Sequence, residues 1–400
     1  MQEVPSHLLH ALKIALVTET FPPEINGVAM TLQRLVGGLA QRGHEVTVLR
    51  PRQGAADAPT GGVWREELFP SLPIPGYAFL RLGLPARRRL AEQWRRQRPD
   101  LVHVATEGPL GYSAIRAARA LGLPVSSSFH TNFHAYSRYY GIGFLTRAAL
   151  AYLRHFHNRT LATFAPTAEL NQQLARSGFA RLRLLARGVD TALFSPTRRR
   201  EDLRAQWGLG PDDLAVVHVS RLAAEKNYPL LFAAFAAIRA AQPRAKLVLV
   251  SDGPLRRKLQ RAHSEAHFTG FLEAGALAEH YASSDLFLYP SLTETFGNVV
   301  LEAMASGLPV AAFNYAAAAR FIRHGENGWL VPFGDRRAFL AGAQTLSADA
   351  ALRRRLGAAA RAAVETVPWE GIVAGFERDL LELVQLAPQP LPPAPQLAPC

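Results

Sequence analysis

Short apolar runs alternate with longer amphipathic segments along most of the chain, and this alternation starts twice, near Lys13 and again near Leu214. Continuous runs of valine, isoleucine and leucine are typical of parallel strands that helices cover on both faces. Two series of this kind predict an α/β protein with two Rossmann-like, doubly wound domains. The expected strands begin at Lys13, His44, Leu101, Val125, Ala162, Leu214, Ala245, Ala266, Leu286 and Leu308.

A basic, polar stretch from Ser195 to Asp213 separates the two series. It predicts an N-terminal domain over residues 1–195 and a C-terminal domain over residues 196–367. A last amphipathic segment follows Pro368 and predicts a helix over residues 368–386. The tail, residues 387–400, is expected to be disordered because of its high proline content. Ligands bind at the carboxyl ends of the strands in doubly wound folds, so candidate site residues are sought there.

The formal net charge is +13, from 45 Lys and Arg residues against 32 Asp and Glu. This excess favours anionic partners, namely nucleotide phosphates, an acidic membrane surface or nucleic acid, without choosing among them. The only cysteine is Cys400, so no disulfide framework is expected within one chain, as in a reducing cytoplasm. No apolar run approaches the roughly 18–20 residues that span a bilayer, and the N-terminus has no signal-peptide plan. We therefore expect a cytoplasmic protein, either free or peripheral at the inner face of the membrane.

The first expected strand ends in the segment TETFPPEINGVAM, in which Gly27 opens a helical run. A glycine at a strand-to-helix turn allows backbone amides to approach a phosphate at the positive end of the helix. The segment lacks the GxGxxG spacing, however. A plain loop in which Glu24 and Asn26 act as caps is therefore the alternative.

The segment SSFHTNFHAYSRYY follows the fourth expected strand and places His130 at its carboxyl end, with Thr131, Asn132 and His134 nearby. A lone histidine is more often structural, but a strand end favours a role in a ligand site. His130 and His134 also have the spacing of a metal-binding pair. The glutamate that follows the first histidine of the zincin motif is missing, which argues against a metal.

The second series opens with VVHVSRLAAEKN, which places Arg221 and Lys226 between a strand and a helix. The guanidinium fork of arginine and the point charge of lysine suit a diphosphate at this edge. Solvated surface charges are the alternative.

The stretch YPSLTETFGNVVLEAMASGLP, from Tyr289 to Pro309, carries two carboxylates, Glu294 and Glu302. If the helix runs from Asn298, Glu302 lies about 6 Å further along the helix axis. The two carboxylates then project from different levels and are not a facing acid pair. They can accept hydrogen bonds from two separate polyols, with a phosphate at the amides of the first helical turn between them. An N-terminal helix charge plus a solvated glutamate is the alternative.

Together these motifs resemble the family-4 glycosyltransferases, which are retaining enzymes of the GT-B fold that use nucleotide-diphosphate sugars. The resemblance covers nearly the whole chain, in the order FPPEINGV, SSFHTN, ARGVD, SRLAAEKN, SDGP, TGFL, ETFGNVVLE and EAMASGLPV. It implies an acceptor-side domain and then a donor-nucleotide domain, which face each other across a cleft, with the C-terminal helix crossing back onto the first. The first loop departs from many relatives, which have Gly-Gly-Val where this chain has Asn26-Gly27-Val28.

The resemblance also implies roles for individual residues. Glu294 would bind hydroxyls of the donor sugar and Glu302 the ribose, while Arg221 and Lys226 would neutralise the leaving diphosphate. His130 would lie over the reacting sugar, so that His130 and Glu294 are the expected catalytic residues. The expected donor-binding residues, among which Phe271 and Leu272 would face the base, are Gly27, Arg221, Lys226, Phe271, Leu272, Glu294, Thr295, Phe296, Gly297, Asn298 and Glu302.

No metal or other cofactor is expected, because GT-B enzymes typically need none and no Asp-x-Asp motif follows a strand. Preorganised cations and amides can instead stabilise the charge that develops on the leaving diphosphate. No carboxylate is an obvious nucleophile. We therefore expect a same-face displacement, in which a donor phosphate oxygen assists deprotonation of the acceptor hydroxyl and His130 orients the sugar.

Two segments bear on the acceptor. The stretch from Phe79 to Pro99 is both basic and apolar. Such a stretch can lie on an anionic membrane or form a solvated helix face. The segment HTNFHAYSRYYGIGFL resembles family members that glycosylate lipids, including GDP-mannose-dependent and sulfoquinovosyl-type enzymes. We therefore expect transfer of a hexose, from GDP-mannose in preference to a UDP-sugar, to a membrane lipid or lipid-linked glycan. A soluble acceptor is the alternative.

Two other classes of protein explain less of the sequence. A GT-B phosphorylase would need a lysine for pyridoxal phosphate, and the lysines of the second domain, Lys226, Lys246 and Lys258, lie in no recognisable cofactor motif. A basic nucleic-acid-binding protein would account for the net charge but not for the residues at the strand ends. No nucleic-acid partner is therefore expected, and the oligomeric state is left open.

Overall fold

The computed structural model describes residues 11–24, 26–59, 61–74, 77–130 and 146–386. These residues form two compact units. The first unit contains residues within 11–130, together with 151–185 and 373–386, and the second contains 146–150 and 186–372. The division falls after Leu185 rather than at residue 195, because Val189 and Phe194 are already buried in the core of the second unit.

The first unit is built on a parallel sheet, which has seven strands among the described residues. Their order is β3-β2-β1-β6-β7-β8-β9, so the sheet grows in one direction from β1 and then reverses at β6. A separate antiparallel hairpin is formed by β4 and β5. The strands are β1 (Lys13–Val17), β2 (Glu45–Pro51), β3 (Arg65–Phe69), β4 (Ser71–Ile74), β5 (Tyr77–Gly83), β6 (Leu101–Val104), β7 (Val125–Ser128), β8 (Ala162–Ala165) and β9 (Leu182–Leu184).

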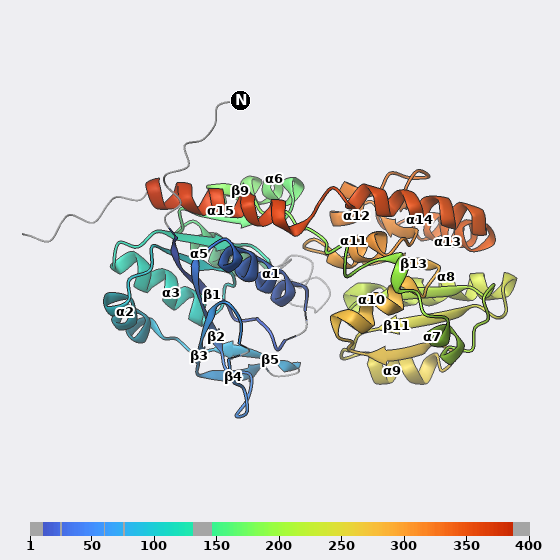
Figure 1. Cartoon of the computed structure of the whole chain (residues 1–400), viewed down its shortest axis with the longest axis horizontal. Helices are drawn as coiled ribbons and strands as arrows, with labels where there is room; N and C mark the ends of the chain where they lie inside the picture. Colours follow the sequence, from blue (N-terminus) through green and yellow to red (C-terminus); the bar gives the residue numbers. More distant parts are fainter. Residues whose placement is uncertain (1–10, 25, 60, 75–76, 131–145, 387–400) are drawn as a thin grey trace, which may run out of the picture. The chain divides into compact units, whose positions relative to one another are not determined.

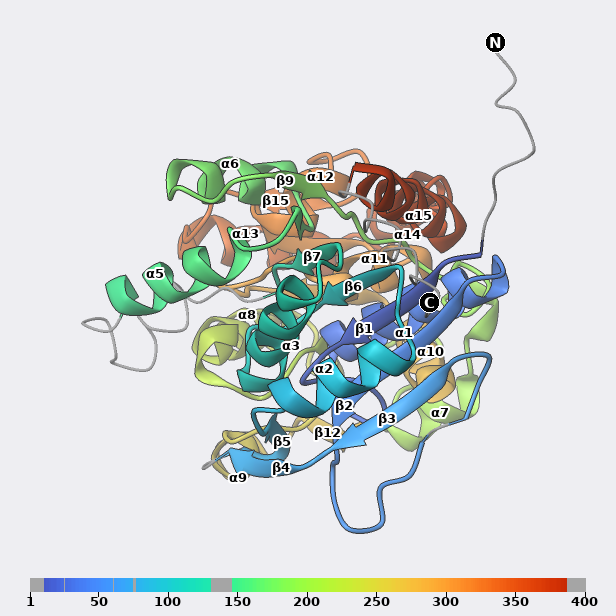
Figure 2. The ribbon, with the colours of Figure 1, turned by 90° about the vertical axis from the view of Figure 1, so that its left-hand side faces the viewer.

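Helices cover both faces of this sheet. On one face, Leu90 and Trp94 of α2 and Ile115 of α3 are buried together with strand residues, and Figure 2 shows α2, α3 and α5 on this side. Among the described residues, the helices of the first unit are α1 (Gly27–Gln41), α2 (Arg87–Arg96), α3 (Pro109–Ala120), the greater part of α5 (Thr146–His157), α6 (Ala168–Arg176) and the greater part of α15 (Trp369–Leu386).

The C-terminal helix α15 packs on the other face of the first sheet (Figure 1). The ring of Phe376 lies edge-on to His103 of β6, with 5.1 Å between centroids. The buried carboxylate of Glu377 accepts a hydrogen bond from Arg42 Nε at 2.6 Å and lies 2.8 Å from His44 Nε2. The amide of Leu12 donates to His44 Nδ1, so Nε2 carries the ring proton and donates to Glu377. Contacts with residues distant in sequence thus attach the end of the chain to the first unit.

The second unit contains a parallel sheet with the order β12-β11-β10-β13-β14-β15 among the described residues. Buried side chains form one apolar cluster on each face of it. Its strands are β10 (Ala215–Val219), β11 (Lys246–Val250), β12 (His267–Gly270), β13 (Leu286–Tyr289), β14 (Val310–Phe313) and β15 (Trp329–Val331). Its helices are α7 (Glu201–Gln206), α8 (Tyr228–Ala241), α9 (Arg256–Ala262), α10 (Ala274–Ala282), α11 (Asn298–Ala305), α12 (Ala316–Phe321), α13 (Arg336–Ala348) and α14 (Ala350–Val364).

Among the described residues, no helix combines the length and apolar character needed to cross a bilayer.

Candidate active site

The second sheet reverses its order between β10 and β13, which lie side by side. Crevices at such reversal points, beyond the carboxyl ends of the strands, are where doubly wound sheets bind ligands. β10 leads into Arg221 and Lys226, and β13 leads into Glu294. The strand order therefore brings Lys226 and Glu294 into contact although 68 positions separate them in the chain.

The Glu294 carboxylate lies at the centre of this strand edge. Its Oε1 accepts hydrogen bonds from Ser291 Oγ at 2.7 Å, from Lys226 Nζ at 2.5 Å and from the hydroxyl of Tyr289. The hydroxyl of Tyr315 donates to the backbone carbonyl of Glu294 at 2.8 Å. Burial, followed by the nearby Glu294 charge, raises the pKa of Tyr289 well above its ordinary value, so this hydroxyl remains a donor. The carboxylate is thus oriented from several sides, as a group that accepts from a sugar hydroxyl would need to be.

Both cations predicted to contact a diphosphate are held by carboxylates in this structure. Lys226 is bound by Glu294, and its Nζ also lies 3.3 Å from the carbonyl of Thr293. The guanidinium of Arg221 pairs with the fully buried carboxylate of Glu225. Ion pairs of this kind can exchange partners when a phosphate offers a charge-assisted bond to the cation and a hydroxyl offers a donor to the carboxylate.

The helix α11 begins next to this cluster in an unusual backbone conformation. Gly297, its N-cap, has φ 93° and ψ 60°, a left-handed conformation that favours glycine. Phe296 is buried just before it, and its carbonyl accepts from the amide of Ala317 at 2.8 Å. Because Gly297 has no side chain, it cannot cap the amides of the first turn. Together with Thr295 and Asn298, which are half-buried, this turn has the character of an anion-binding helix start.

Glu302 has partners of its own, one turn further into α11. The hydroxyl of Tyr281 donates to Glu302 Oε2 at 3.2 Å and lies 3.4 Å from the carbonyl of Val299. Burial raises the pKa of Glu302 to about 7, so the group exchanges its proton near neutrality. Glu294 and Glu302 share no hydrogen-bond partner among the described contacts. They are therefore two separately held carboxylates and not a facing acid pair.

Phe271 and Leu272, expected to face the base, follow β12 after Gly270, which has a left-handed φ of 80°. The side chain of Phe271 is 43% exposed. Leu272 packs against the apolar cluster on one face of the sheet. Phe271 is thus the member of this pair that offers a ring to a planar ligand.

In the first unit, Gly27 is the exposed first residue of α1. Two amides of that helix start are bound within the protein, because Asn26 Oδ1 accepts from Val28 N at 3.0 Å and from Ala29 N at 2.9 Å. Asn26 is therefore the helix cap that the plain-loop interpretation proposes. The buried carboxyl of Glu24 accepts from Asn26 Nδ2 at 3.2 Å and helps to hold that cap.

His130 follows β7 and is 8% exposed. Its predicted neighbours Thr131, Asn132 and His134 fall outside the described residues. His134 would also be the second histidine of the alternative metal-binding pair.

Sequence reasoning did not identify the hydroxyls and the acid that hold the predicted residues. Tyr289, Ser291 and Tyr315 orient Glu294, Tyr281 binds Glu302, and Glu225 binds Arg221. Tyr289 and Ser291 stand in the stretch already singled out, and Tyr315 follows β14 by two residues. The rule that strand ends carry site residues, applied to hydroxyls as well as charges, would have found these three.

Comparisons with known proteins agree with this architecture. The family described as "Glycosyltransferase Family 4" matches residues 25–193, and the one described as "Glycosyl transferases group 1" matches residues 213–349. A GDP-mannose-dependent alpha-mannosyltransferase of Mycolicibacterium smegmatis is 39% identical over 364 residues, which cover 90% of this chain and 94% of the relative. An alpha-monoglucosyldiacylglycerol synthase of Streptococcus pneumoniae is 28% identical over 315 residues, or 75% of this chain and 71% of the relative.

The fold has close counterparts among solved structures. Sucrose-phosphate synthase from Thermosynechococcus elongatus superimposes with a TM-score of 0.76 at 21% identity, covering 93% of this chain and 99% of the other. The resemblance of the motifs and the expected fold are therefore confirmed: the chain is a glycosyltransferase of family 4 with the GT-B fold.

Proposed function

We propose that this glycosyltransferase moves a mannosyl group from GDP-mannose to a hydroxyl of a membrane lipid or lipid-linked glycan. The observation that carries the proposal is the contact of Lys226 with Glu294 at the point where β10 and β13 meet. A hydroxyl acceptor and a phosphate partner lie side by side there, as a sugar diphosphate requires. The mycolicibacterial relative, whose name gives GDP-mannose as donor, supports the choice of donor.

In this proposal the donor is held by groups that each meet one part of it. Glu294 accepts from sugar hydroxyls, and Lys226 and Arg221 turn from their carboxylates to the diphosphate. The amides at Thr295 to Asn298 bind phosphate or sugar oxygens, with the ring of Phe296 buried behind them. Glu302 accepts from the ribose hydroxyls, and Phe271 with Leu272 meets the base. For Gly27 and His130, which belong to the first unit, roles toward the donor are implied by the family resemblance alone.

The chemical step would be a displacement on one face of the sugar. The bond between the anomeric carbon and the diphosphate oxygen breaks, and the acceptor oxygen bonds to the same face of that carbon. The acceptor proton passes to the oxygen of the leaving diphosphate, whose new charge Lys226 and Arg221 stabilise. The product is an α-glycoside, and no metal takes part. A His130→Ala enzyme that turns over at nearly the normal rate would remove His130 from this step.

The lipid acceptor is supported by the pneumococcal relative, whose name gives a diacylglycerol product. It is also supported by the stretch from Phe79 to Pro99, which forms the end of β5 and the helix α2. Leu90 and Trp94 of α2 are buried in the core, so the apolar residues of that helix face inward. The exposed surface is instead basic, with apolar contributions from Leu82 and Leu84. Contact with an anionic bilayer would therefore be mainly electrostatic.

A panel of labelled donors tests the proposal: GDP-mannose, UDP-glucose, UDP-galactose, UDP-glucuronate and UDP-N-acetylglucosamine, each incubated with bacterial lipid extract. We expect label from GDP-mannose in the organic phase, with an α-anomeric signal in the product and no loss of rate in EDTA. Transfer of another sugar would overturn the choice of donor, and label in the aqueous phase alone would overturn the lipid acceptor. If none of the donors turned over, the proposal as a whole would fail.

A further inference from the structure

The first unit carries a basic hollow that none of the proposed steps uses. Its volume is about 500 Å³, and it lies where the C-terminal ends of α3 and α5 approach each other. The side chains that line it are those of Arg119, Ala151, Arg154, His155, Asn158 and Arg159. Three of the six are arginines and none is acidic.

The absence of acids extends over both helices. The sequences of α3 and α5 contain no aspartate or glutamate. Their packing is aromatic: the ring of Tyr112 on α3 lies 6.2 Å from that of Tyr152 and 6.4 Å from that of Phe156 on α5. Apolar contacts thus fix the spacing of the two helices, and the cations at their ends are left facing outward.

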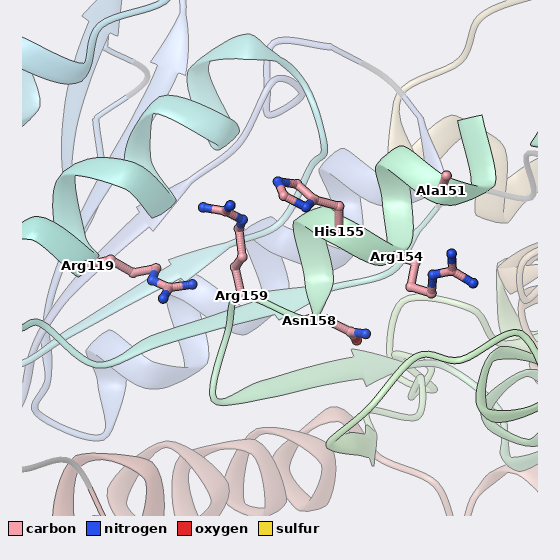
Figure 3. A pocket seen from close by; sticks show the side chains of 6 residues that line it. All are labelled: Arg119, Ala151, Arg154, His155, Asn158 and Arg159. Carbon is pink, nitrogen blue, oxygen red and sulfur yellow. The ribbon is translucent and has the colours of Figure 1, made fainter. Parts of the chain in front are cut away.

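The arginines of the hollow differ from those that the chain holds in ion pairs, such as Arg183 and Arg200. Among the described residues, Arg119, Arg154 and Arg159 form no ion pair, whereas Arg183 and Arg200 each pair with two acids. Figure 3 shows the side chains of Arg119, Arg159 and His155 extending into the same space, while Arg154 points elsewhere. Arg154 instead lies 3.3 Å from the carbonyl of Ser177.

A purely structural role accounts for only part of this arrangement. Arg119, Arg154 and His155 lie in last helical turns, where a cation complements the negative end of the helix dipole. Arg159 lies beyond the end of α5, so it is not explained in this way. Gathering like charges around one hollow is unfavourable unless an anion neutralises them.

We propose that this hollow binds a phosphate group, which the guanidinium forks of Arg119 and Arg159 hold from two sides. Guanidinium–phosphate pairs are bidentate and keep their charge at any physiological pH. The phosphate can belong to a soluble phosphate ester or to the headgroup of an anionic lipid, because both present the same oxygens. The site is separate in the chain from the residues that the proposed function assigns to the donor.

The test follows the arginine side chains directly. The Nε–Hε NMR signals of Arg119 and Arg159 are identified by their loss in Arg119→Gln and Arg159→Gln, and inorganic phosphate is then titrated into the full chain. We expect both signals to shift and saturate, while the signal of the exposed Arg65 does not move. The double variant should bind phosphate at least about tenfold more weakly, since it lacks both guanidinium groups that would form charge-assisted bonds to the phosphate. The pair Arg65→Gln and Arg323→Gln, which removes two exposed and ion-paired cations, should bind like wild type.

Flotation with phosphatidylglycerol vesicles and with phosphatidylcholine vesicles separates the two sources of phosphate. If the headgroup is the ligand, the double variant should lose flotation with phosphatidylglycerol and the control pair should keep it. If wild type and double variant float equally, and the NMR signals of Arg119 and Arg159 shift and saturate with phosphate, the site binds soluble phosphate esters. The proposal would be overturned if the Arg119 and Arg159 signals of the wild type did not respond to phosphate and the double variant floated like wild type.

Discussion

The two units each contain a strand followed by a loop and a helix, and the two loops are built differently. In the first unit, the loop before α1 is closed by its own side chains, since Asn26 caps the helix and Glu24 accepts from Asn26, Thr20 and Gln53. In the second unit, α11 starts at a glycine, and the carboxylate of Glu294 is held by a lysine. The first arrangement is made of neutral donors and the second of charges that can change partners.

The neutral surroundings of Glu24 affect the protonation of its carboxyl. Burial raises the pKa of Glu24 to about 7, and its bonded partners are an amide, a hydroxyl and a second amide. The first loop is thus held by neutral hydrogen-bond donors, and the second by an ion pair.

The largest effect is expected from neutralising the exchangeable carboxylate. In Glu294→Gln the enzyme loses its strongest hydroxyl acceptor and leaves Lys226 without its counter-ion. We expect kcat/KM for the sugar donor to fall about 100- to 1000-fold, as for other oriented polar groups at reacting centres. Initial rates of sugar transfer at several donor concentrations, for wild type and Glu294→Gln, measure this fall in kcat/KM. The control is Glu279→Gln, which removes an exposed partner of Arg200 in the same unit and should leave kcat/KM unchanged.

The carboxyl of Glu24 should affect the pH dependence of stability rather than the rate of turnover. Its folded pKa of about 7 lies above the ordinary 4.5, so the folded protein binds more protons between these values. The contribution of Glu24 to stability is then fully present below pH 4.5 and is lost as pH rises through 7. For wild type this loss should reach about 2–3 kcal/mol in the free energy of unfolding.

Urea unfolding of the first unit at about pH 5 and about pH 8 measures this loss. Glu24→Gln should be less sensitive to pH by at least that amount. The pKa of Glu19 is also raised to about 7, chiefly by burial and in smaller part by the Glu24 charge, which the variant lacks. An identical pH dependence in wild type and Glu24→Gln would show that the loop does not hold a neutral carboxyl.

The start of α11 should not tolerate a side chain. At the left-handed φ of 93°, Gly297→Ala is expected to lower the free energy of unfolding by about 1–2 kcal/mol. Space is not the reason, since the nearest side-chain atom to an added Cβ is Glu294 Cγ at 3.6 Å. Gly275→Ala, in open space within α10, should be neutral or stabilising. Equal stability of Gly297→Ala and wild type in urea titrations would contradict the assigned backbone conformation.

The smallest effect is expected at the cap of the first loop. Asn26→Ala removes the acceptor for Val28 N and Ala29 N and should cost about 1 kcal/mol of stability. Asn26→Asp keeps an acceptor at the same place and should retain most of the stability. Thermal unfolding compares the two variants, and equal losses would mean that the acceptor oxygen is not what Asn26 contributes to stability.

The strands that could be predicted are those with continuous apolar runs, such as β10 and β11. The strands β3 and β9 were missed because their residues are polar and only partly buried at the edges of the sheet. The strand β15 was missed because it has three residues, too few for any periodicity. The division between the units was placed too late because the apolar Val189 and Phe194 stand close to the polar stretch that suggested it.

Within the site, position relative to the strands could be read from the sequence, but pairing could not. Lys226 and Glu294 were each placed at a strand end, and each was given a ligand as partner. Their contact depends on the adjacency of β10 and β13, which is a property of the strand order and not of either motif. The same holds for Arg221, whose partner Glu225 lies four positions away in a short helical turn.

The central claim is that Glu294 holds the sugar of the donor and Glu302 holds the nucleotide. Equilibrium binding of GDP and GDP-mannose to wild type, Glu294→Gln and Glu302→Gln tests it most directly. We expect wild type to prefer GDP-mannose to GDP by about tenfold, Glu294→Gln to lose that preference while it still binds GDP, and Glu302→Gln to weaken both ligands equally. A Glu294→Gln protein that keeps the preference, or that loses GDP as strongly as GDP-mannose, would contradict the account.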